Sequence, residues 1–205
     1  MANLITLSRL LLLFVLAAIA YHASPLWQLL HVPLIVAIFA SDGLDGYVAR
    51  KRGEDSLFGS LFDIAIDRVV ENVLWIVLAD LDLVPVWVPI VFITRGAIVD
   101  TLRGHGAAQG STPFGMMHSE LGRFLVAGRF MRIGYAVVKA IAFGWILFFQ
   151  PLPALAPDLW AQVAGPAGAI GMFWVYAAVA LCLLRGLPVV WDFALGMRRD
   201  PDLRP

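Results

Sequence analysis

The sequence is poor in cysteine and in charge. A single cysteine, Cys182, stands among 205 residues, which excludes an internal disulfide and any metal site built from several cysteines. Only 15% of the residues are Asp, Glu, Lys or Arg, whereas a soluble domain carries about 25%. Apolar residues make up 60% of the chain, and the mean hydropathy is +0.82. A soluble protein is thereby excluded, and the length suits one integral membrane domain covering residues 1–205.

Apolar runs of about 20 residues, the length needed to cross the hydrocarbon core of a bilayer, occur along the whole chain. They predict an all-α fold with six transmembrane helices near residues 4–22, 27–50, 57–79, 84–104, 124–150 and 167–193. Prolines favour turns between the predicted helices; they are Pro25, Pro151, Pro153, Pro157 and Pro166.

Lysine and arginine are absent from three of the predicted connections, near residues 23–30, 80–90 and 151–166. They follow the second predicted helix at 50–52, flank the long polar segment 104–122 and recur in the last residues of the chain. Positive charges on alternate connections predict, by the positive-inside rule, that both termini and the segment 104–122 are cytoplasmic.

Four aspartates lie within or beside the second and third predicted helices, where an ionisable side chain is costly and marks a candidate functional site. Asp42 and Asp45 are three residues apart, and Asp63 and Asp67 are four apart, so each pair shares a helix face. Small residues one turn away on the same faces leave room for a ligand to approach the backbone; they are Gly46, Ala49 and Gly59. Arg50 adds a positive charge at the cytoplasmic end.

If these two helices face each other, four carboxylates converge and repel one another unless cations or protons neutralise them. Carboxylate oxygens suit Mg²⁺ or Mn²⁺, ions that leave coordination positions open to substrate phosphates. Two such ions roughly 4 Å apart could polarise a phosphoryl group and stabilise the attacking and leaving oxygens. The simpler alternative is that single acids cap helices or pair with arginines, and Arg68 with Glu71 could form such a local pair.

The acidic pattern resembles the motif of the CDP-alcohol phosphotransferase family, with eight fixed positions in 26 residues: Asp42-x2-Asp45-Gly46-x2-Ala49-Arg50-x8-Gly59-x3-Asp63-x3-Asp67. The resemblance implies that a CDP-linked lipid donates its phosphatidyl group to an alcohol and releases CMP. It implies two divalent metal ions at the four aspartates, with Asp67 as the general base that takes the proton of the acceptor hydroxyl. It further implies nucleotide contacts from Gly46, Ala49, Arg50 and Gly59.

The acceptor is indicated by weaker signals. The opening "NLITLSRLLLLF" and the stretch "TRGAIVDTLRG" resemble segments of phosphatidylglycerophosphate synthases, while Arg129-x2-Arg132 resembles an arginine pair of phosphatidylinositol-phosphate synthases. Both relatives take a phosphorylated acceptor, and arginine binds phosphate through two hydrogen bonds. We therefore expect Arg95, Arg103, Arg129 and Arg132 to bind the acceptor phosphate, with glycerol 3-phosphate the expected acceptor. The alternative is that Arg95 pairs with Asp100, or that the arginines extend to the lipid headgroups. Lys139 could pair with a motif acid.

Other readings stay open at this point. Within the family, phosphatidylinositol-phosphate, phosphatidylserine and cardiolipin synthesis use the same chemistry with different acceptors. Outside it, a carboxylate-lined transporter of divalent cations is the alternative, although such a protein is expected to place acids near the bilayer midplane, often with inverted repeats. The expected partners are CDP-diacylglycerol, a small alcohol and the lipid bilayer, without nucleic acid. The resemblance also implies a homodimer, and we expect a bacterial cytoplasmic membrane protein whose active site faces the cytoplasm.

Overall fold

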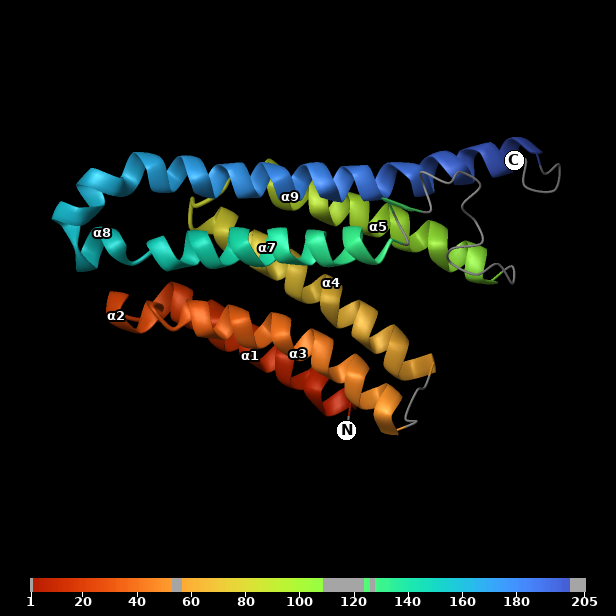
Figure 1. Ribbon diagram of the computed structural model, residues 1–205, viewed down its shortest axis with the longest axis horizontal. Coiled ribbons are helices and arrows are strands. Elements are labelled where there is room, and N and C mark those ends of the chain that lie inside the picture. The colour runs from red at the N-terminus through yellow and green to blue at the C-terminus, as the bar shows by residue number, and fades with distance from the viewer. Residues whose placement is uncertain (1, 53–56, 109–123, 126–127, 200–205) are drawn as a thin grey trace. The chain divides into compact units, whose positions relative to one another are not determined.

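The computed structural model describes residues 2–52, 57–108, 124–125 and 128–199 (Figure 1). Side chains are described for these residues except at 2–4, 43–52, 57–58, 60, 105–108, 129 and 196–199. Every element in the described residues is a helix, which confirms the all-α prediction. The helices are α1 (Ala2–His22), α2 (Pro25–Gln28), α3 (His31–Arg52), α4 (Leu57–Asp80), α5 (Trp87–Ala108), α7 (Arg129–Phe149), α8 (Leu152–Leu155) and α9 (Pro157–Arg199).

Four stretches of the described helices are long and apolar enough to cross a membrane: Ile5–His22, Pro25–Asp42, Phe130–Leu155 and Pro157–Leu195. Helices α4 and α5 coincide with two further predicted spans, and each exceeds 20 residues. Charged residues lower their hydropathy: α4 carries Asp63, Asp67, Arg68, Glu71 and Asp80, and α5 carries Arg95, Asp100 and Arg103. The structure thus supports an integral membrane protein, while the number of six spans stays a prediction.

The largest boundary error concerns α9. We predicted a helix from 167 with turn prolines before it, but α9 begins at Pro157 and continues through Pro166 and Pro188. Pro157 opens the helix, where its missing N–H has no intrahelical partner to lose. Proline inside a helix is tolerated in membrane proteins because neighbouring groups satisfy the freed carbonyl.

Two other boundaries differ from the prediction near the polar segment 104–122. Helix α5 continues to Ala108, so the first five residues of the predicted loop are helical, and residues 109–123 lie outside the described part. Helix α7 begins at Arg129 rather than at 124. A Cβ atom at Gly128 would lie 2.2 Å from the Phe124 carbonyl oxygen, so the backbone conformation before α7 requires glycine.

The chain divides into two compact units. The first comprises Met1–Pro89 and Ala140–Val175, and the second comprises Ile90–Lys139 and Tyr176–Pro205. In the first unit, α1 packs against α3 and α4. The Trp75 and Phe143 rings in its core lie 4.4 Å apart between centroids. In the second unit, buried Val99 and Val189 pack with Leu102.

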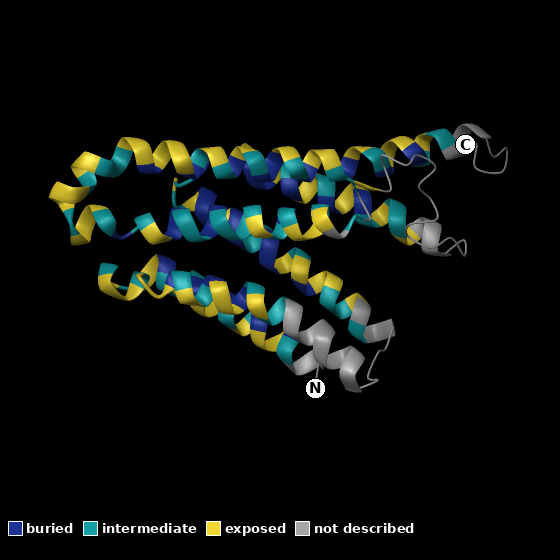
Figure 2. Ribbon diagram, in the orientation of Figure 1, coloured by how far each residue is buried: buried dark blue, intermediate teal, exposed yellow. Residues whose placement is uncertain are grey.

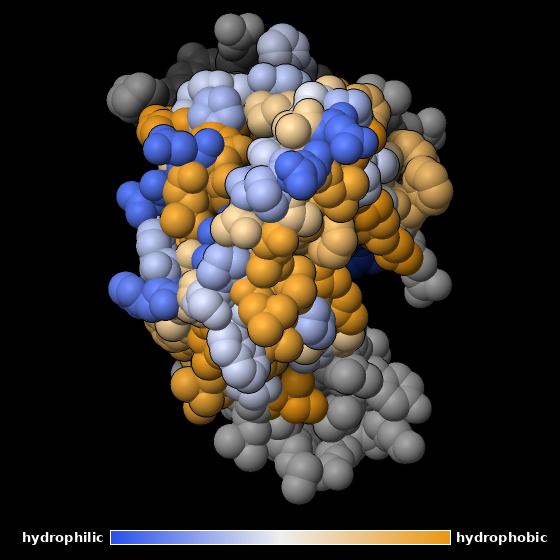
Figure 3. Space-filling view, turned by 90° about the vertical axis from the view of Figure 1, so that its left-hand side faces the viewer, coloured by the Kyte–Doolittle hydropathy of each residue, from blue (hydrophilic) through white to orange (hydrophobic). Residues whose placement is uncertain are grey.

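Large apolar side chains cover much of the exterior, as expected for helices surrounded by lipid. Exposed residues run along the lengths of α1 and α9 in Figure 2, and they include Leu11, Phe14, Phe173 and Trp191. Figure 3 shows hydrophobic and hydrophilic side chains side by side on one end face. An exterior of this kind would be an aggregation liability in water and is stable in a bilayer.

Candidate active site

Three of the four predicted metal-site aspartates lie together in the first unit. Asp42 lies on α3, and Asp63 and Asp67 lie one turn apart on α4. One carboxylate oxygen from each of the three lies within 4.8 Å of the other two. Asp42 and Asp63 are half-buried and Asp67 is exposed, so the cluster is accessible to a solute. Asp45 also lies on α3, but its side chain is outside the described part.

Arg9 of α1 reaches into this cluster and was missed as a site residue by sequence reasoning. Its Nη2 lies 2.8 Å from Asp42 Oδ1, and its Nη1 lies 3.1 Å from Asp63 Oδ1. Nη2 also donates to Asp67 Oδ1. Only 3% of the Arg9 side chain is exposed. The available signal was its position as the single charged residue in the first apolar run, because a buried cation in a membrane span needs an anionic partner.

The charges of the cluster suit a divalent cation. Three carboxylates and one guanidinium give a formal charge of −2, and Asp45 of the same motif makes it −3. The described ligand atoms are all carboxylate oxygens. These are hard ligands, which bind Mg²⁺ and Mn²⁺ in preference to softer metals. The donor set therefore fits the predicted metal ions, with Asp42, Asp63 and Asp67 as the described residues that could hold one.

The predicted nucleotide-binding residues lie on the same two helices. Gly59 is partly exposed on α4, one turn before Asp63. Gly46, Ala49 and Arg50 lie on α3, where the side-chain environment falls outside the described part. Their contacts with a nucleotide stay a prediction.

A cluster of arginines forms in the second unit. Arg95 of α5 packs against α9, because a Cβ atom at Gly186 would lie only 2.9 Å from Arg95 Cγ. Arg185, the neighbour of Gly186, donates from Nη1 to the Met131 carbonyl of α7 at 3.3 Å. Arg95, Arg103 and Arg132 all lie close enough to Arg185 to repel it electrostatically. Arg95, Arg103 and Arg132 were predicted, whereas Arg185 was missed; the side chain of predicted Arg129 is outside the described part.

Tyr135 of α7 contacts two cations in this unit. Its buried ring lies 4.3 Å from Lys139 Nζ and 5.2 Å from Arg185 Cζ, measured to the ring centroid. Both distances are within the range of cation–π attraction. Tyr135 was also missed by sequence reasoning, because an aromatic residue in an apolar run gives no distinguishing signal.

One predicted ion pair is confirmed. Arg68 Nη1 lies 2.9 Å from Glu71 Oε2 on α4, and only 6% of the Glu71 side chain is exposed. Arg68 and Glu71 therefore lie on α4, the helix that carries Asp63 and Asp67, but they form a local ion pair three residues apart.

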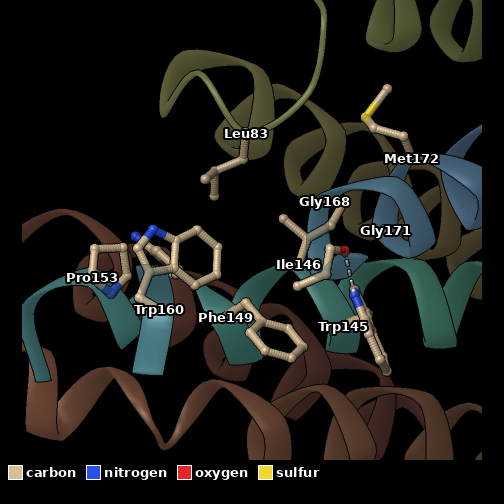
Figure 4. Close-up of a pocket in the computed structure, with 11 residues that line it drawn as sticks. Leu83, Trp145, Ile146, Phe149, Pro153, Trp160, Gly168, Gly171 and Met172 are labelled. Atoms are coloured by element: carbon tan, nitrogen blue, oxygen red, sulfur yellow. Dashed lines mark hydrogen bonds between the residues drawn. The ribbon is translucent and has the colours of Figure 1, made fainter. Parts of the chain in front are cut away.

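A separate apolar cavity of about 170 Å³ lies in the first unit, between the ends of α7 and α8 and the start of α9 (Figure 4). Aromatic rings of Trp145, Phe149 and Trp160 line it, and Trp145 Nε1 donates to the Ala167 carbonyl at 2.9 Å. None of the predicted site residues lines this cavity. It is therefore distinct from the aspartate cluster.

Comparisons with known proteins agree with the acidic motif. A family model described as CDP-alcohol phosphatidyltransferase matches residues 1–197. A similar protein of Bacillus subtilis (strain 168), named CDP-diacylglycerol–glycerol-3-phosphate 3-phosphatidyltransferase, is 34% identical over 79 residues. That match covers 38% of this chain and 41% of the relative. Because the family model covers nearly the whole chain, including Arg9 and all four motif aspartates, the chain belongs to the CDP-alcohol phosphatidyltransferase family.

Proposed function

We propose that this protein transfers a phosphatidyl group from CDP-diacylglycerol to glycerol 3-phosphate, forming phosphatidylglycerol phosphate and releasing CMP. The observation that carries the proposal is the convergence of Asp42, Asp63 and Asp67 within 4.8 Å in a chain of this family. The acceptor is supported by the name of the Bacillus subtilis relative and by the arginine cluster of the second unit.

In the reaction, the acceptor hydroxyl oxygen forms a bond to the phosphorus that carries the diacylglycerol, and the phosphoanhydride bond to CMP breaks. Mg²⁺ or Mn²⁺ at the aspartates, with two ions expected, would neutralise the diphosphate and the leaving CMP. Asp67 accepts the proton of the attacking hydroxyl, a role that its exposure permits. Gly46, Ala49, Arg50 and Gly59 bind the nucleotide.

The acceptor phosphate is bound by arginines of the second unit. Arg95 and Arg185 lie side by side although their charges repel, and an anion between them would stabilise this arrangement. A phosphomonoester carries about −1.5 to −2 charges near pH 7 and three acceptor oxygens. Arg103, Arg129 and Arg132 complete the proposed phosphate site.

The proposed setting is a bacterial cytoplasmic membrane that the chain crosses six times, with both termini and the active site on the cytoplasmic side. The supporting observation is the lack of lysine and arginine in the connections near 23–30, 80–90 and 151–166. A homodimer is the proposed assembly, following the family resemblance.

The test is CMP release by the purified protein from labelled CDP-diacylglycerol. Release should require Mg²⁺ or Mn²⁺, should stop on chelation, and should be faster with glycerol 3-phosphate than with inositol phosphate, serine or phosphatidylglycerol. Asp63→Asn should lower the rate strongly. Asp80→Asn, a control at the other end of α4 whose oxygen accepts from Tyr21, should not.

Metal-independent turnover would refute the metal role. Faster release with another acceptor would refute glycerol 3-phosphate while leaving the family assignment in place. Failure to release CMP with any acceptor would favour the divalent-cation transporter that the sequence left open.

A further inference from the structure

We infer that Arg9 is a positioning residue of the metal site, holding the carboxylates of Asp42, Asp63 and Asp67 in the arrangement that binds a divalent cation. The inference rests on the proposed metal-dependent function and adds a residue outside the acidic motif. It assigns α1 a part in the chemistry of the site that α3 and α4 carry.

The position of Arg9 on α1 directs its side chain to the interior. Thr6, Arg9, Leu13 and Leu16 recur at helical spacing, and each is at most 3% exposed. This buried face belongs to a helix that packs against α3 and α4. The guanidinium therefore points toward the carboxylates and away from lipid and bulk water.

The shape of the guanidinium suits three carboxylates at once. Its N–H donors lie in a fixed plane, so the two terminal nitrogens can bind different partners without a change of rotamer. Nη2 joins Asp42 of α3 to Asp67 of α4, and Nη1 binds Asp63. One side chain of α1 thus fixes ligand groups from two other helices.

A carboxylate can bind Arg9 and a cation at the same time. The contacts described above use Oδ1 of the aspartate concerned, and the two oxygens of a carboxylate together offer about four lone-pair sites. Arg9 and a metal ion can therefore share the same three carboxylates. This arrangement matches the general observation that outer partners orient metal ligands.

Arg9 also carries a positive charge that repels a cation. This repulsion must be compared with the benefit of holding the three carboxylates in position. The aspartate side chains are 38–46% exposed, and water therefore screens the repulsion between the guanidinium and the ion. The guanidinium nitrogens lie 2.8 and 3.1 Å from carboxylate oxygens of Asp42 and Asp63, so attraction to Arg9 opposes the mutual repulsion of the aspartates. Without Arg9, the half-exposed carboxylates would turn apart into water, and we expect this loss of positioning to dominate.

The test is Mn²⁺ binding to the purified full chain in detergent micelles, measured from the EPR signal of the unbound ion without lipid substrate. Arg9→Gln should weaken Mn²⁺ binding about tenfold or more, the range seen when outer partners of metal ligands are removed. Arg9→Lys, which keeps the charge but loses the planar donors, should weaken it less. Ser8→Ala, at the adjacent exposed position, should bind Mn²⁺ like the wild type. Thermal unfolding checks that each variant is folded.

Wild-type or tighter Mn²⁺ binding by folded Arg9→Gln would overturn the inference. If Arg9→Gln fails to fold, Arg9→Lys is the variant that tests the inference. Wild-type Mn²⁺ affinity in Arg9→Lys would then overturn it. Asp63→Asn separates this failure from that of the proposed function. If Asp63→Asn also binds Mn²⁺ normally, the aspartate metal site itself is wrong; if only the arginine variants do, the inference about Arg9 fails alone.

Discussion

A substitution at Gly186 can displace the Arg95 side chain while Arg95 itself is left unchanged. In Gly186→Ala, the new Cβ atom would lie 2.9 Å from Arg95 Cγ and 3.0 Å from Arg95 Nε. Contacts between carbon atoms are normally about 3.5–4.0 Å, so the arginine must move by roughly 0.5–1 Å. A charge-assisted hydrogen bond of about 2.8 Å would then be stretched to the limit of a useful contact.

The expected kinetic effect follows from the loss of one such contact to the acceptor phosphate. A hydrogen bond to a charged group contributes about 1.5–3 kcal/mol, or about ten- to a hundredfold in affinity. Because arginine is flexible and can recover part of the contact, we expect about a tenfold increase in the KM for glycerol 3-phosphate. The KM for CDP-diacylglycerol should change little, since the aspartate cluster is untouched.

A matched glycine separates this effect from that of adding a methyl group to a helix. At Gly144 of α7, a Cβ atom would meet nothing within 4 Å. Gly→Ala in a helix interior favours the helix by about 1 kcal/mol at either position. Gly144→Ala should therefore keep wild-type kinetics. An unchanged acceptor KM in Gly186→Ala, or an equal change in both variants, would refute the placement of Arg95 at the phosphate.

Other contacts can be tested by substitution. Arg68→Gln should lower the free energy of unfolding by about 3 kcal/mol or more, because it leaves the buried Glu71 carboxylate without this cation. Glu71→Gln should cost less, since Arg68 is 28% exposed; thermal unfolding that gives the reverse order would contradict this. Ser56→Cys, with Cys182 replaced, should resist labelling from outside intact cells, and efficient labelling would overturn the proposed topology. Trp145→Phe should lose about 1 kcal/mol with its hydrogen bond to Ala167 while leaving CMP release unchanged; slower release would show that the apolar cavity affects turnover.

The helices were predictable where a long apolar run ends in a polar turn. Helix α1 was predicted at 4–22 and spans Ala2–His22, and α4 was predicted at 57–79 and spans Leu57–Asp80. The prediction for α9 is wrong because proline favours a turn in most chains, whereas a membrane helix tolerates it in the interior. Composition alone did not separate these two uses of proline.

The acidic site was partly predictable because its spacing is local. A separation of four residues places Asp63 and Asp67 on one face of a helix, whatever surrounds that helix. The hydrogen bonds of Arg9 to Asp63 and Asp67 join residues 54 and 58 positions apart in the sequence, and periodicity carries no information about such pairs. Arg185 was missed for the same reason, because its relation to Arg95 depends on Gly186 and on the packing of α9 against α5.

The two interior prolines of α9 stand 22 residues apart, about 33 Å along a helix at 1.5 Å per residue. This length matches a hydrocarbon layer about 30 Å thick. If the bilayer is centred between these prolines, the carbonyls of Gln162 and Leu184, freed by Pro166 and Pro188, would lie near the two lipid headgroup levels, where water could hydrate them. A helix with weakened bonds at both levels can bend there and follow a thinner or thicker bilayer without tilting as a rigid rod.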